Sequence, residues 1–69
     1  MNEWQKIYEN TIEHRAEIVK GVLEEQGIGA VLVPKKDSAY QLFGHFEVLV
    51  APDDVMRALK IVNEEIKFE

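Results

Sequence analysis

The chain has 69 residues, of which 46% are hydrophobic and 30% are charged, a composition typical of one small globular domain over residues 1–69. Thirteen acidic and eight basic side chains leave a formal net charge of −5, which argues against binding to nucleic acids or anionic membranes. No apolar run approaches the roughly 20 residues needed to span a bilayer. Because cysteine is absent, disulfides and thiol chemistry are excluded, and we expect a cytoplasmic protein.

The first half of the chain predicts a strand followed by an amphipathic helix. Residues 4–8, "WQKIY", are rich in strand-favouring side chains. In the segment 10–27, Asn10 and Glu13 form a capping-box pattern, and Gly27 is a typical residue for a helix end. One apolar stripe at helical spacing is expected to face a core, and it consists of Ile12, Ala16, Val19 and Leu23.

The second half predicts two strands and a second helix. The β-branched runs 29–33 and 46–50 are each followed by a proline and are expected to pair antiparallel. Residues 51–66 predict a helix, because Pro52 suits a first turn and the two aspartates after it favour the helix dipole. Its apolar stripe consists of Val55, Ala58, Leu59, Val62 and Ile66. The last residues, 67–69, are either a short edge strand or a frayed end.

The resulting order, β-α-β-β-α, predicts an α+β domain with a split β-α-β, or ferredoxin-like, arrangement and both helices on one face of the sheet. We expect that covered face to carry Ile7, Val31, Val33, Phe46, Val48 and Val50. Because side chains alternate along a strand, the open face would then carry Trp4, Tyr8, Leu32 and Leu49. Such an apolar face favours a homo-oligomer, a dimer or larger, unless the strand phases are reversed or the C-terminal segment covers it.

Several segments resemble a known family. "WQKIYENT", "AEIVKGVLEEQGI" and "EVLVAPDD" followed by "RALKIV" are similar to a small bacterial domain of unknown function described as putative prokaryotic signal transducing proteins. The resemblance spans nearly the whole chain and implies a fold related to the PII-type nitrogen regulators. PII proteins bind nucleotides between subunits and contact targets through a long loop after the second strand. The corresponding loop here is much shorter, and the family supplies no catalytic residue or ligand to carry over.

The connection between the last two strands, residues 33–45, holds the remaining candidates. Two lysines and a serine could meet a phosphate or another small anion, or the lysines could only solvate the loop and protect the strand edge. No glycine-rich phosphate motif occurs in the chain. The aromatic residues either fold back over the core or form a surface that binds a protein partner. The candidate anion- or partner-binding residues are Lys35, Lys36, Ser38, Tyr40 and Phe43.

Catalytic and metal-binding patterns are weak. The loop serine has no recognisable base, so we expect neither an enzyme nor a cofactor. His14 and His45 lack a metal-binding spacing, and a metal site would require both to converge, so none is expected. We therefore expect a non-enzymatic regulatory module that uses the 33–45 loop and the sheet surface for partner recognition and self-association. The alternative is a sensor that binds a nucleotide or phosphate anion at a subunit cleft near Lys35 and Lys36.

Overall fold

The computed structural model describes residues 3–36 and 44–66, and the segments 1–2, 37–43 and 67–69 lie outside this description. The order of the elements confirms the predicted β-α-β-β-α arrangement and the α+β class. The elements are β1 (Gln5–Asn10), α1 (Glu13–Glu25), β2 (Ala30–Lys36), β3 (Gly44–Val50), the short 3-10 turn η1 (Pro52–Asp54) and α2 (Val55–Glu65). The C-terminal strand or frayed end considered above falls on undescribed residues.

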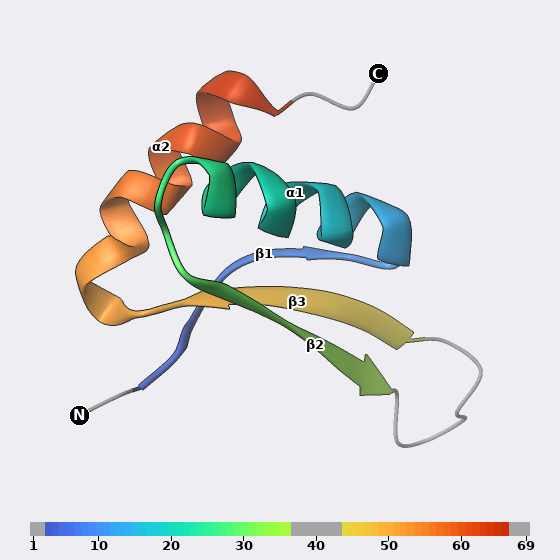
Figure 1. The fold of residues 1–69 in the computed structure, drawn as a ribbon. Helices are drawn as coiled ribbons and strands as arrows, with labels where there is room; N and C mark the ends of the chain where they lie inside the picture. Colours follow the sequence, from blue (N-terminus) through green and yellow to red (C-terminus); the bar gives the residue numbers. More distant parts are fainter. Residues whose placement is uncertain (1–2, 37–43, 67–69) are drawn as a thin grey trace.

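The three strands form one sheet in the order β1-β3-β2, and β3 pairs antiparallel with both neighbours. β1 and β2 therefore run parallel to each other on either side of β3, and α1 is the crossover between them. This is the predicted split β-α-β of a ferredoxin-like fold. Both helices lie on the same side of the sheet, so the described helices leave its other face uncovered (Figure 1).

The core lies between the helices and the covered face of the sheet. Its buried apolar residues are Ile7, Ala16, Val19, Leu23, Ile28, Ala30, Val48, Val50, Ala58 and Ile61. Three members of the predicted α1 stripe are therefore confirmed, whereas Ile12 is exposed. In α2 the prediction placed Leu59 in the stripe and missed Ile61. Ile61 follows Ala58 by nearly one turn, while Leu59 is rotated from Ala58 by about 100° and lies at the margin of the stripe.

The predicted capping box at the start of α1 is wrong. The helix begins at Glu13, and its N-cap residue, Ile12, makes no side-chain capping bond. Asn10 instead ends β1, where it pairs with Phe46, and its Oδ1 accepts a hydrogen bond from the Ile12 N–H at 2.8 Å. Strand pairing thus continues to Asn10, which leaves it too early in the chain to be the residue that caps the helix.

The predicted helix end at Gly27 is confirmed. Gly27 has a φ of 87°, and its N–H donates to the Glu24 carbonyl at 3.0 Å. The Ile28 N–H donates to the Leu23 carbonyl at 2.9 Å, and both side chains are buried. These bonds form a Schellman motif, which turns the chain and inserts Ile28 into the core.

That insertion sets the phase of β2, and the predicted phase is wrong by one residue. Residues directly opposite each other on paired strands share a face, and Leu32 lies opposite the buried Val48. Leu32 consequently packs against the core. Val31 and Val33 lie on the open face instead, because alternation from the buried Ile28 leads through Ala30 to Leu32.

A β-bulge explains the second error, the expected position of Tyr8 on the open face. Lys6 pairs with Leu49 and Tyr8 pairs with Val48, so Ile7 is an extra residue between them. Because of the bulge, Ile7 is buried and Tyr8 also packs against the core. The Tyr8 hydroxyl accepts a hydrogen bond from Asn10 Nδ2 at 2.8 Å. Of the other residues predicted for the open face, Leu49 is confirmed there, and Trp4 is exposed just before β1.

Candidate functional site

The face of the sheet that the helices leave uncovered, called the open face below, combines apolar and charged side chains. By strand register, its members are Lys6, Glu9, Val31, Val33, Lys35, His45, Glu47 and Leu49. Val31 and Leu49 lie directly opposite each other, and both are only half-buried. Glu9, Lys35, His45 and Glu47 lie toward the Gly44 end of β3, whereas Lys6 lies opposite Leu49.

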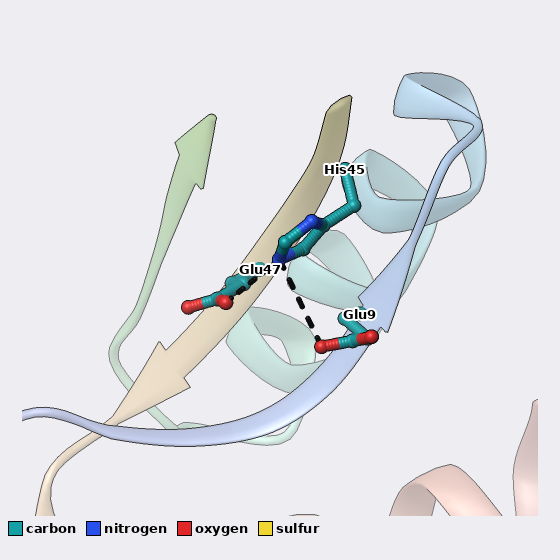
Figure 2. Close-up of side chains that lie close together, drawn as sticks. All are labelled: Glu9, His45 and Glu47. Carbon is teal, nitrogen blue, oxygen red and sulfur yellow. Dashed lines mark hydrogen bonds and ion pairs between the residues drawn. The ribbon is translucent and has the colours of Figure 1, made fainter. Parts of the chain in front are cut away.

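Three of these side chains form a compact cluster that we call the Glu9–His45–Glu47 cluster (Figure 2). Glu9 and Glu47 are directly opposite each other on β1 and β3, and His45 lies two residues before Glu47 on the same face. The His45 Nε2 atom is 2.9 Å from Glu47 Oε2 and 3.9 Å from Glu9 Oε1. One donor atom from each side chain lies within 4.8 Å of the others.

Backbone packing at the start of β3 helps to place His45. Gly44 pairs with Lys36, and a Cβ atom at Gly44 would lie only 2.6 Å from the Lys35 carbonyl oxygen. Only glycine allows this approach without a shift of the backbone. The two strands therefore extend beyond the predicted ends at Val33 and Phe46, and His45 becomes part of the sheet rather than of a loop.

Lys6 lies beside the Glu9–His45–Glu47 cluster and contributes a positive charge there. Its Nζ donates a hydrogen bond to Glu9 Oε1 at 2.6 Å and lies 3.9 Å from Glu47 Oε2. The hydrogen bond, and then the attraction between the charges, raises the pKa of Lys6 and lowers the pKa of Glu9. Because carboxylates on directly opposite strand positions repel, the ammonium offsets a repulsion that the strand register imposes. Lys6 and Glu9 are about half exposed, so water screens their interaction.

The predicted loop residues are brought together only in part. Lys35 and Lys36 are exposed and belong to β2, where consecutive side chains point to opposite faces of the sheet. Lys35 lies opposite His45, on the open face, whereas Lys36 lies opposite Gly44. Neither makes a side-chain hydrogen bond or ion pair with a described residue. The other three candidates, Ser38, Tyr40 and Phe43, lie outside the described residues.

The Glu9–His45–Glu47 cluster was not predicted from the sequence, because a metal site was expected only where two histidines converge. His14 lies on α1, exposed and apart from His45 on the sheet. One signal was present in the sequence, since the spacing of His45 and Glu47 places them on the same face of a strand. Glu9 could join them only through the register of β1 and β3, which the bulge sets.

One known family matches a range of the chain that includes all the helices and strands and the Glu9–His45–Glu47 cluster. A family model described as "Putative prokaryotic signal transducing protein" matches residues 4–66, a range that runs from the start of β1 past the end of α2. No curated protein and no solved structure matches the chain significantly. Among the described residues, no helix has the length and apolar character needed to cross a membrane.

Proposed function

Since the chain belongs to the family described as putative prokaryotic signal transducing proteins, we propose that it is a non-enzymatic regulatory domain that acts by binding through its open face. The first partner of that face is a second copy of the chain, and the product is a dimer. Recognition of a further protein then takes place on the assembled dimer. The observation that carries this proposal is the Val31–Leu49 pair on a face that the helices do not cover.

The apolar part of the open face supports association. Val31 and Leu49 are adjacent on β2 and β3, and Val33 follows on the same side of β2. Exposed apolar side chains that lie next to each other gain free energy when a second surface removes them from water. A domain of 69 residues has a small core, so burial of an additional apolar surface adds considerably to its stability.

One pair of opposite charges on the same face fits a second copy. Lys35 lies on the β2 edge without an ion pair to a described residue, and Glu9 lies on the opposite edge, β1. A twofold axis parallel to β3 lays β2 of each copy over β1 of the other. The ammonium group of Lys35 then approaches the edge that carries Glu9 of the other copy. Opposite charges that meet across a twofold interface favour one orientation over others.

An anion sensor at Lys35 and Lys36, the alternative function, receives less support from the geometry. Two ammonium groups that bind one phosphate must lie on the same side of the sheet, but the side chains of Lys35 and Lys36 leave β2 on opposite faces. One of them, Lys35, remains available for an anion on the open face. The arrangement therefore favours Lys35 as a contact to a carboxylate of a partner surface rather than as half of a phosphate site.

Multi-angle light scattering over a concentration series tests the proposed dimer. We expect the wild-type mass to rise from the 8.0 kDa of one chain toward twice that value. Leu49→Glu should remain at the mass of one chain, because it places a charge in the centre of the proposed interface. Met56→Glu is the control, since Met56 is 80% exposed on α2, in the other layer of the molecule.

Circular dichroism of each variant checks that the fold is retained. A wild-type mass that stays at one chain over the whole series would contradict the dimer. If Met56→Glu abolishes association and Leu49→Glu does not, the interface lies on the helices instead.

A further inference from the structure

We propose that the Glu9–His45–Glu47 cluster is a binding site for a divalent transition-metal ion, for which Zn²⁺ is the reference. This inference goes beyond the proposed dimer, which needs no metal. One imidazole nitrogen and two carboxylate oxygens are ligands that Zn²⁺ takes in proteins. Mg²⁺ and Ca²⁺ prefer oxygen ligands alone, so the imidazole of His45 favours a transition metal over them.

The distances within the cluster are close to those of a metal site. Ligand atoms about 2.0–2.2 Å from a shared Zn²⁺ lie about 3–3.5 Å from one another. The distance from His45 Nε2 to Glu47 Oε2 is 2.9 Å, and that to Glu9 Oε1 is 3.9 Å. These two values lie on either side of the required separation. All three atoms lie within 4.8 Å of one another, so rotation of the side chains is needed to bring them to a common ion.

The sheet holds the ligands at this spacing. Glu47 lies on the central strand and its side chain is only 16% exposed, compared with 36% for His45 and 50% for Glu9. Glu47 is the most enclosed ligand because strands flank it on both sides, and within one chain the site is most open to solvent at Glu9. Three protein ligands leave at least one coordination position for water or another molecule, as in open metal sites.

Lys6 occupies the place of a cation beside these carboxylates. Its ammonium lies 2.6 Å from Glu9 and 3.9 Å from Glu47, so it offsets the repulsion between two carboxylates that face each other. A metal ion that binds Glu9 must displace this ammonium. The displaced pair is exposed on both sides, and such ion pairs contribute little free energy. Lys6 is thus a competitor of the metal, not a ligand, and its removal should tighten binding.

Calorimetric titration with Zn²⁺ of the full chain, prepared without a histidine tag, tests the site. We expect one Zn²⁺ per chain, an affinity lowered on the order of tenfold or more in His45→Ala and in Glu47→Gln, and an affinity raised in Lys6→Met. His14→Ala is the matched control, because it removes the only other histidine and should leave the affinity unchanged. Mg²⁺ should bind far more weakly than Zn²⁺ in the same titration.

Nuclear magnetic resonance of the imidazole nitrogens identifies the ligand directly. Added Zn²⁺ should shift the Nε2 resonance of His45 and leave that of His14 unchanged. The proposal is overturned if the wild type binds no Zn²⁺, if His45→Ala binds it as tightly as the wild type, or if Lys6→Met weakens binding. Leu49→Ala keeps every charge of the cluster and adds none beside Lys6, so it should still bind one Zn²⁺ per chain, which separates this inference from the proposed dimer.

Discussion

The two faces of the sheet use the same three strands for different purposes. On the face covered by helices, Val48 and Val50 are fully buried in the core. On the open face, Leu49 forms an apolar pair with Val31, and Glu47 belongs to the Glu9–His45–Glu47 cluster. A step of one residue along β3 therefore separates a position that stabilises the fold from one available for binding.

The largest expected effect is a difference in the free energy of unfolding when a leucine is replaced by alanine in the core and on the open face. Leu23→Ala removes a fully buried side chain of α1 and should lower the free energy of unfolding by about 2–5 kcal/mol. Leu49→Ala on the open face should cost about 1 kcal/mol or less at low protein concentration, because water already reaches that side chain. Urea unfolding followed by circular dichroism measures both. Equal losses in dilute solution would mean that the open face is covered within one chain.

A smaller effect tests the phase of β2. Leu32→Asp places a charge against the core and should destabilise the fold by about 2–3 kcal/mol. Val31→Asp places it on the open face opposite Leu49, and about 1 kcal/mol is expected from the poor strand preference of aspartate. The difference between the two urea midpoints is the measurement. The reverse order would restore the phase expected from sequence.

The smallest effect concerns the charges of the open face. The hydrogen bond from Lys6 lowers the pKa of Glu9. The bond therefore stabilises the fold fully above the ordinary carboxyl pKa, about 4.3, and this stabilisation is lost as the pH falls through the lowered pKa. The raised pKa of Lys6 means that the stabilisation is also lost in strong alkali. Glu9→Gln should therefore be less stable than the wild type at neutral pH and equal to it in acid. Urea midpoints at several pH values, with chelator present, measure this difference.

The control for that series is Glu17→Gln, an exposed carboxyl on α1. A Glu9→Gln deficit that persists unchanged in acid would show that the ion pair is not its cause.

Most of the fold could be predicted from local patterns. The stop at Gly27, the proline after β3 and the stripe of α1 are short-range signals, and they predict the β-α-β-β-α order correctly. Pro34, which was expected to follow a strand, lies within β2. The faces were harder to predict, because β2 is apolar at every position from Ala30 to Val33 and alternation alone gives no phase. The buried Ile28 after the Schellman turn decides that phase.

The candidate site depended on contacts between distant segments. His45 and Glu47 are neighbours on one strand, but Glu9 reaches them across 36 positions of sequence through the register of β1. The bulge at Ile7 shifts that register, and no residue in "WQKIY" signals a bulge. A sequence pattern can therefore predict two members of the Glu9–His45–Glu47 cluster, while the third requires the structure.

The central claim, that the open face is the binding face, is tested most directly by amide resonances recorded over a series of protein concentrations. We predict that increasing concentration shifts the resonances of Val31, Val33 and Leu49 and leaves those of Met56 and Leu59, exposed on α2, unchanged. Shifts confined to α2, or no shift at any concentration, would contradict the account.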